Sequence, residues 1–135
     1  MLSLEYVAGY FDGEGCISLY KHHKNQELSG YLRYGLYCRV ASVNPKILEL
    51  FKKYFGGSIS KRVARHENHR DTYCWSISAK KADHFLTTLY DFFKLKKAEA
   101  KLALEYRKKS YYEIWVDHEY YVKEMSRLKR LKYSL

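Results

Sequence analysis

The stretch at residues 7–15 reads Val-Ala-Gly-Tyr-Phe-Asp-Gly-Glu-Gly, and it is the segment that decides the fold. Apolar side chains recur at helical spacing over residues 3–12, which predicts a helix that begins at the N-cap Ser3 and ends at Gly13 and Gly15. No Lys or Arg occurs in this helix, although the chain as a whole is rich in both. The sequence therefore predicts a helix whose C-terminal end presents acidic side chains among glycines.

Two glycines of this helix, Gly9 and Gly13, are four residues apart and therefore share one face. A face of small residues lets a second helix backbone approach closely. Since the sequence contains one such helix, the expected partner is the same helix of a second copy, related by a two-fold axis that brings two Glu14 carboxylates together. The predicted homodimer interface comprises Val7, Ala8, Gly9, Asp12 and Gly13.

The charge of the chain points to a partner that carries phosphates. Twenty-five Lys and Arg against fifteen Asp and Glu leave a formal charge of +10 in 135 residues. Anionic membranes attract the same charge, but no stretch approaches the roughly 20 apolar residues of a spanning helix, and no signal peptide is recognised. We therefore expect an intracellular protein without a membrane partner, in a bacterial or phage cytoplasm or in an organelle.

The cysteines favour reduced, structural roles. Cys16, Cys38 and Cys74 are odd in number, far apart and without C-x-x-C spacing. His66, His69 and Cys74 together could suggest zinc, but no fourth ligand stands at a familiar spacing, so a zinc site is not favoured.

The remaining elements alternate strands and helices. Strands are expected at about residues 15–24, 31–41, 58–65 and 71–78, and helices at about 45–54, 80–92, 96–108 and 110–130. This order predicts an α+β fold of αββαββα type, with helices on one face of one antiparallel sheet. We expect a single domain over residues 1–135, with a core at 1–109 and a C-terminal helix at 110–135.

Alternation within the strands predicts which face of the sheet is buried. In the second pair of strands the expected inward set is Ile59, Val63, Trp75 and Ile77. On the last helix, an apolar stripe is expected to pack onto the domain, and it comprises Tyr111, Trp115, Val122, Met125 and Leu128.

The segment at residues 7–15 resembles the LAGLIDADG motif in its variant that ends in Asp-Gly-Glu-Gly. The matching positions are Ala8, Gly9, Asp12, Gly13, Glu14 and Gly15, while Val7, Tyr10 and Phe11 are apolar replacements. Membership of the single-motif, homodimeric group of LAGLIDADG homing endonucleases implies a saddle-shaped antiparallel sheet over the major groove of double-stranded DNA. It also implies C-terminal helices after the αββαββα core.

The resemblance implies a set of catalytic residues. Two Glu14 carboxylates at a two-fold axis would repel one another unless a divalent cation lay between them, and oxygen ligands suit Mg²⁺, or Mn²⁺ in its place. Glu14 and Gly13 are therefore the predicted metal-binding positions. Residues 92–104 look like the family stretch that supplies an active-site lysine, which here is Lys96. Ser42 falls where relatives often have a water-positioning glutamine, and Lys46 falls near a basic partner of that residue.

The outward face of the predicted sheet is basic, aromatic and hydroxylic, which suits contacts with bases and phosphates. The residues expected to bind DNA are Ser18, Tyr20, His22, Lys24, Arg33, Tyr37, Arg39, Ser60, Arg62, Arg70, Thr72, Cys74 and Ser76.

Taken together, these features lead us to expect a homing endonuclease that makes a magnesium-dependent, staggered double-strand cut in a long, nearly palindromic site. Two alternatives remain open: an intron-splicing maturase of the same fold, which would bind intron RNA, or a DNA-binding regulator that does not cleave. An HNH-type nuclease built on Glu67, Asn68 and His69 is disfavoured because the segment supplies no metal-binding strand and helix unit.

Overall fold

The structure is a computed structural model that describes residues 3–23 and 32–131. In chain order its elements are α1 (Leu4–Glu14), β1 (Gly15–His23), β2 (Leu32–Ser42), α2 (Pro45–Phe55), β3 (Ser58–Arg62), β4 (Thr72–Ser78), α3 (Ala79–Leu89), the 3₁₀ helix η1 (Tyr90–Phe92), α4 (Lys97–Lys108) and α5 (Tyr111–Leu131). None of the helices in the described ranges is long and apolar enough to span a lipid bilayer.

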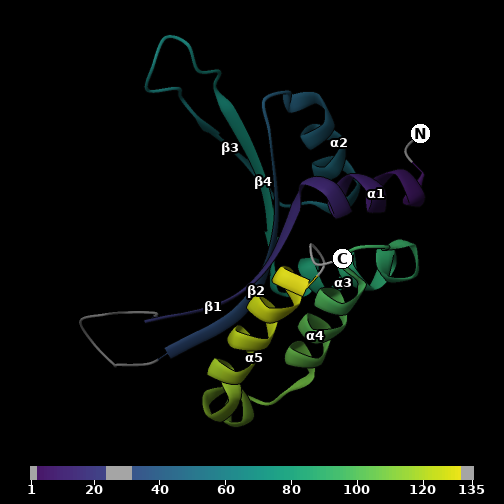
Figure 1. The fold of residues 1–135 in the computed structure, drawn as a ribbon, viewed down its shortest axis with the longest axis vertical. Coiled ribbons are helices and arrows are strands. Elements are labelled where there is room, and N and C mark those ends of the chain that lie inside the picture. Colours follow the sequence, from purple (N-terminus) through teal and green to yellow (C-terminus); the bar gives the residue numbers. More distant parts are fainter. Residues whose placement is uncertain (1–2, 24–31, 132–135) are drawn as a thin grey trace.

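The four strands form one antiparallel sheet in the order β1-β2-β4-β3. Figure 1 shows the sheet bent into an arc, with the helices gathered against its convex side and the concave side uncovered. This arrangement confirms the predicted α+β architecture. The sheet therefore has one face for the core and one face available to a large ligand.

Local capping signals place the helix starts as the sequence predicts. Ser3 Oγ accepts a hydrogen bond from the Tyr6 N–H at 3.1 Å, and Asn44 Oδ1 accepts one from the Lys46 N–H at 3.0 Å. Ser110 and Glu113 form a reciprocal capping box at the start of α5, with bonds of 3.1 and 3.3 Å.

The end of α1 differs from the prediction. Gly13 does not end the helix, which continues to Glu14 and is capped by Gly15, whose N–H donates to the Phe11 carbonyl. A Cβ at position 15 would stand 2.3 Å from the Phe11 ring, so only glycine fits there. Glu14 therefore belongs to the last turn of α1, directly before β1 begins.

The core lies between the helix-facing side of the sheet and α1 to α5. Trp75, Phe51 and Phe85 are fully buried at its centre, with ring centroids 5.1 to 6.3 Å apart. Of the predicted inward set, Trp75 and Ile77 are buried and Ile59 packs against the core. The prediction for Val63 is wrong, because its side chain is 67% exposed. β3 ends at Arg62, and the chain beyond it projects past the helices (Figure 1).

The apolar stripe on α5 is also displaced from the prediction. Its buried residues are Ile114, His118, Tyr121 and Met125, whereas Tyr111 and Trp115 are 46% and 56% exposed. The stripe keeps helical spacing, but a histidine stands at its second position. Met125 is buried and Leu128 packs against the core, as predicted, so the prediction is wrong at Tyr111 and Trp115 and misses His118 because that residue is polar.

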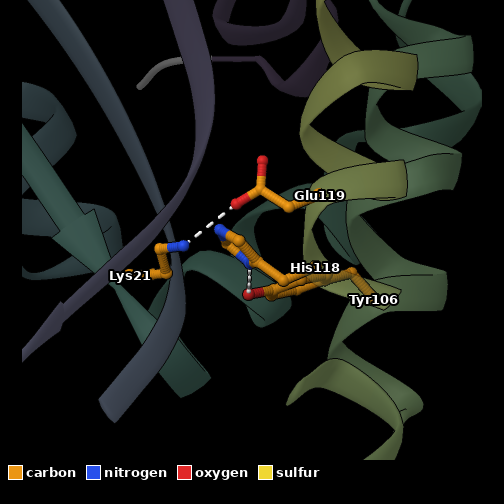
Figure 2. A network of polar contacts seen from close by, with 4 residues as sticks. All are labelled: Lys21, Tyr106, His118 and Glu119. Atoms are coloured by element: carbon orange, nitrogen blue, oxygen red, sulfur yellow. Dashed lines mark hydrogen bonds and ion pairs between the residues drawn. The ribbon is translucent and has the colours of Figure 1, made fainter. Parts of the chain in front are cut away.

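His118 docks α5 onto the sheet and α4. Its Nδ1 is 2.9 Å from the Tyr106 hydroxyl, and the Tyr34 ring lies 4.9 Å from its ring (centroid to centroid). Figure 2 shows the Lys21–Glu119 ion pair beside it, with 3.0 Å between Nζ and Oε1. Burial lowers the pKa of His118, Lys21 lowers it further, and Glu119 opposes the shift. The fold therefore favours the neutral imidazole.

The stability of the protein should therefore depend on pH through His118. Unfolded histidine binds a proton near pH 6.5, and the folded pKa lies lower, so the unfolded chain binds more protons between the two values. The contribution of His118 to the free energy of unfolding should be complete above about pH 6.5 and decrease as the pH falls below it. Urea unfolding between pH 5 and 8 should show a shallower pH dependence for His118→Asn than for the wild type; equal dependence would contradict this account.

Candidate functional site

The last turn of α1 is joined to the segment before α4 by Asp12. Its side chain is 7% exposed and accepts two backbone hydrogen bonds, from the Lys94 N–H at 2.7 Å and from the Lys96 N–H at 3.0 Å. In return, Lys96 Nζ donates to the Asp12 carbonyl at 2.8 Å. These contacts connect residues more than 80 positions apart in the sequence.

Both halves of this contact follow from helix electrostatics. The N–H of Lys96, the N-cap of α4, lacks a partner within the helix, and the Asp12 carboxylate satisfies it together with the Lys94 N–H two residues earlier. The Lys96 ammonium lies against the negative end of the α1 dipole, where a cation is stabilising. Lys96 is only 2% exposed, so its side chain is buried against the C-terminal end of α1.

The exposed face of α1 is narrower than the predicted interface. The side chains of Val7, Ala8 and Asp12 are buried within the chain itself, at 2%, 0% and 7% exposure, which corrects their assignment to a partner-facing surface. Gly9 and Gly13 are exposed, and a Cβ at either position would meet nothing within 4 Å. The glycine face of α1 is therefore open.

Leu95 is an exposed apolar residue near the last turn of α1 that the sequence analysis missed. It is 52% exposed and stands between the two backbone amides that Asp12 holds. Its neighbours in the sequence are lysines, so the local pattern gives no apolar periodicity that would single it out.

Glu14 lines a hollow of about 520 Å³ on the concave side of the sheet. The side chain is exposed, in contrast to that of Asp12 two residues earlier. The other residues that line the hollow are Cys16, Arg39, Ala41, Ser60, Arg62, Thr72 and Cys74. The last turn of α1 thus places one carboxylate, that of Glu14, in a hollow whose other charged residues are Arg39 and Arg62.

Of the four predicted catalytic residues only Glu14 lines this hollow; Lys96 is buried under α1, and Ser42 and Lys46 lie elsewhere. Alternation along β2 places Ala41 on the concave face and Ser42 on the other, opposite Tyr73. Ser42 Oγ accepts a hydrogen bond from the Asn44 N–H at 3.1 Å, at the start of α2. Lys46 lies in the first turn of α2, where its N–H is capped by Asn44.

Strand register brings most of the predicted DNA-binding residues onto the concave face. In β1 and β2, Cys16, Ser18 and His22 stand opposite Arg39, Tyr37 and Arg33, and the Tyr20 ring lies 5.9 Å from the Tyr37 ring. In β3 and β4, Ser58, Ser60 and Arg62 stand opposite Ser76, Cys74 and Thr72. Arg70 lies in the connection between these strands and lines a hollow of about 510 Å³ with Arg62, Arg65, His66 and His69. Lys24 lies outside the described residues.

A larger hollow, of about 880 Å³, adjoins the same face at the start of α3. Arg39, Tyr37 and Ser76 line it together with Lys80 and Lys81, which the sequence analysis did not select. Lysines in the first turn of a helix interact unfavourably with its dipole. This unfavourable position was the one signal in the sequence that Lys80 and Lys81 could have a role other than helix stabilisation.

The cations of the concave face are not neutralised within the described ranges. The ion pairs of the described residues as a whole are Lys21–Glu119, Lys61–Asp71, Arg107–Asp83, Lys109–Glu113 and Arg127–Glu124. None of them involves Arg33, Arg39 or Arg62, whose side chains are exposed. A concave surface with unpaired cations attracts a polyanion.

The surroundings of Cys16 lower the pKa of its thiol. Partial burial raises the pKa of its thiol, but the Ser18 hydroxyl at 3.4 Å and the charges of Lys129 and Arg39 outweigh burial, so the pKa is lowered. Lys129 reaches Cys16 from α5, with 3.6 Å between Nζ and Sγ.

Comparison with known proteins places the chain among nucleases of one family. A sequence model described as LAGLIDADG endonuclease matches residues 7–119. No curated protein sequence matches the chain. Among solved structures, the homing endonuclease I-CvuI in complex with the I-CreI target superposes with a TM-score of 0.73 at 20% identity, over 93% of this chain and 80% of that one.

Two further structures have the same fold. An archaeal intron-encoded homing endonuclease, I-Vdi141I, complexed with DNA, has a TM-score of 0.60 at 22% identity, with 96% of this chain and 80% of that chain covered. The homing endonuclease I-TnaI has a TM-score of 0.59 at 21% identity, with 96% and 95% covered.

Mutation of Asp12 and of Glu14 should affect the stability of the protein differently. Asp12→Ala leaves two N–H donors without their acceptor, at a cost of about 1–3 kcal/mol each where they are buried, so the free energy of unfolding should fall. Glu14→Gln changes an exposed side chain and should leave that free energy within about 0.5 kcal/mol of the wild type. Urea unfolding of both variants measures this; equal stability of Asp12→Ala and the wild type would refute the assigned role of Asp12.

Proposed function

The chain belongs to the LAGLIDADG endonuclease family, and from this premise we propose that it is a site-specific endonuclease of double-stranded DNA that acts as a homodimer. Its reaction is a magnesium-dependent, staggered cut of both strands in a long, nearly palindromic site. Fold relatives solved with DNA support duplex DNA as the partner.

One observation carries this proposal: Glu14 stands in a hollow on a face that is otherwise polar and cationic. An exposed carboxylate among unpaired arginines weakens the attraction for phosphates, so it serves another purpose there. The Glu14 carboxylate is an oxygen ligand, and such a ligand suits a divalent cation that lies beside a DNA phosphate.

The homodimer is supported by the open face of α1. Gly9 and Gly13 offer no side chain to a partner helix, and Tyr6, one helical turn before Gly9, is an exposed aromatic residue. Close approach of two such helices across a two-fold axis buries these residues. Because Glu14 lies in the last turn of α1, the same axis brings both hollows toward the centre of a two-fold DNA site.

The donor set fits magnesium. Asp12 is committed to the Lys94 and Lys96 amides, which leaves Glu14 as the carboxylate that each copy contributes from the motif. Mg²⁺ is commonly bound by one or two carboxylates, substrate phosphates and water. Gly13 could add its carbonyl, since carbonyls in the last turn of a helix lack helical partners.

Bound magnesium would lower the pKa of a coordinated water and stabilise charge on the phosphate. Glu14 would hold that cation, and the exposed arginines of the concave face would hold the duplex beside it. In the reaction a water oxygen bonds to phosphorus, the P–O bond to the leaving oxygen breaks, and the leaving oxygen takes up a proton. Each copy acts on one strand, so the paired sites make two offset cuts.

Replacing Glu14 should separate binding from cleavage. We expect Glu14→Gln to bind a target selected from a randomised library at least as tightly as the wild type, because one negative charge is removed from the DNA-binding face. Cleavage in Mg²⁺ should be lost, whereas Glu5→Gln, at the exposed start of the same helix, should cleave normally. Gel-shift assays in Ca²⁺ and cleavage assays in Mg²⁺ measure both quantities; magnesium-dependent cleavage by Glu14→Gln would exclude the mechanism.

Replacing Gly9 should separate folding from dimerisation. A leucine at position 9 has open space within the chain, so the monomer should fold, but it blocks close approach of a second α1. Sedimentation velocity should show a monomer for Gly9→Leu and a dimer for the wild type and for the control Glu49→Leu, at an exposed position of α2. A dimeric Gly9→Leu, or a monomeric wild type on its DNA, would overturn the proposed assembly.

A further inference from the structure

We propose that the Tyr20 ring, oriented by Gly35, recognises the methyl group of one thymine in each half of the DNA target. This inference rests on the proposed function and deepens it, because it assigns base recognition to one ring of the concave face. Tyr20 is the residue that determines specificity, and Gly35 is a positioning residue that acts through it.

The Tyr20 side chain lies across the neighbouring strand. Tyr20 of β1 and Gly35 of β2 are partners in the register of the sheet. A Cβ atom at position 35 would stand 2.3 Å from the Tyr20 hydroxyl oxygen and 2.7 Å from its Cε1 atom. The far end of the ring therefore occupies the space that a side chain at position 35 would need.

Planar groups flank the Tyr20 ring on both sides along the strands. The His22 ring stacks on it, with 5.4 Å between centroids and 21° between planes. The Tyr37 ring lies 5.9 Å from it (centroid to centroid), and the Arg39 guanidinium carbon lies 5.9 Å from the centre of the Tyr37 ring. The register places His22 and Tyr37 on opposite sides of the Tyr20–Gly35 pair. We call these four side chains the aromatic row: His22, Tyr20, Tyr37 and Arg39.

The aromatic row is ordered by its own contacts. Tyr20 and Tyr37 are half-buried, and Gly35 is buried beside the Tyr20 ring. Side chains that are already held by their neighbours lose little conformational entropy when a ligand binds. The Tyr20 ring therefore offers a preformed surface on the face that receives the duplex.

The position of the Tyr20 hydroxyl decides what this surface offers to DNA. The hydroxyl oxygen lies over Gly35, so the side chain extends across the sheet to β2, and ring carbons are left for contact with a ligand. Most groups at the base edges in the major groove are hydrogen-bond donors and acceptors, whereas the thymine C5 methyl group is apolar. An aromatic surface among hydroxyls and guanidinium groups therefore suits thymine.

Ring stacking on a base is not the mode of contact that an intact duplex allows. Its bases are stacked on one another and present only their edges in the groove. Aromatic side chains that stack on bases bind single strands instead. Contact between the Tyr20 ring and a methyl group needs no distortion of the duplex.

The test removes a single methyl group from the DNA. Targets are first selected from a randomised library by binding to the wild type. They are then synthesised with one thymine at a time replaced by deoxyuridine, which lacks the C5 methyl group. Gel shifts in Ca²⁺ give dissociation constants for the wild type, Tyr20→Ala, Tyr20→Phe, Gly35→Ala and the double variant. The control is Tyr112→Ala, which removes a 69% exposed tyrosine of α5, outside the sheet.

For the wild type, we expect one thymine of each half-site to be sensitive to this replacement. Loss of its methyl group should raise the dissociation constant about fourfold, which corresponds to the burial of one methyl-sized group. Tyr20→Ala should bind the thymine and uracil targets equally well. Tyr20→Phe should discriminate as the wild type does, because it keeps the ring and loses only the hydroxyl. Tyr112→Ala should also discriminate normally.

Gly35→Ala tests the positioning role. The added methyl group displaces the far end of the Tyr20 side chain, which can move, so the variant should fold and bind DNA. Its discrimination between thymine and uracil should be lost. On the Tyr20→Ala background, Gly35→Ala should cause no further loss, because the two substitutions act on the same ring.

The inference is overturned if the selected targets share no thymine, or if the wild type binds every deoxyuridine target as tightly as the parent. Normal discrimination by Tyr20→Ala overturns it too. Weaker binding of Tyr20→Phe, with no dependence on any methyl group, would show that the hydroxyl contacts the DNA instead. A wild type that binds its selected target but does not cleave it in Mg²⁺ refutes the endonuclease proposal, and this outcome is distinct because the test of Tyr20 measures binding alone.

Discussion

The buried contact between Asp12 and the segment at Lys94–Lys96 is the constraint on which the arrangement of the site depends. The carboxylate fixes the last turn of α1 to the start of α4, and the Lys96 ammonium fixes the Asp12 carbonyl in return. With α1 held in this rotation, Val7 and Phe11 enter the core, while Gly9 and Gly13 face outward. Glu14 then emerges on the concave face of the sheet.

The same molecule thus uses two acidic residues, two positions apart, in different ways. Asp12 accepts hydrogen bonds from backbone donors inside the chain, whereas the Glu14 carboxylate is exposed in a hollow of the concave face. The sheet separates charges in a related way, because its convex side is covered by helices and its concave side keeps arginines without carboxylate partners among the described residues. A stable core and an exposed cationic surface coexist because they lie on different faces of the same strands.

Local signals made much of this predictable. Capping residues such as Ser3 and Asn44 define helix starts through hydrogen bonds within three residues, and strand alternation assigns Arg39 to the outer face without tertiary information. The misplaced residues depend on contacts distant in sequence. The burial of Lys96 follows from a carbonyl 84 positions away, and His118 joins the α5 stripe because Tyr106 and Tyr34 accommodate its polar ring. In hindsight, Asp12 follows buried Ala8 by one helical turn, which hints at its inward direction.

The central claim is that two copies of α1 meet along their glycines and place both Glu14 carboxylates at metal ions on DNA. An anomalous difference map from crystals of the protein bound to its target duplex and soaked in Mn²⁺ tests this directly. The account predicts manganese within coordination distance of Glu14 and of a DNA phosphate oxygen, with the second copy's Glu14 related by the two-fold axis. Manganese bound away from Glu14, or α1 helices that do not touch one another, would contradict it.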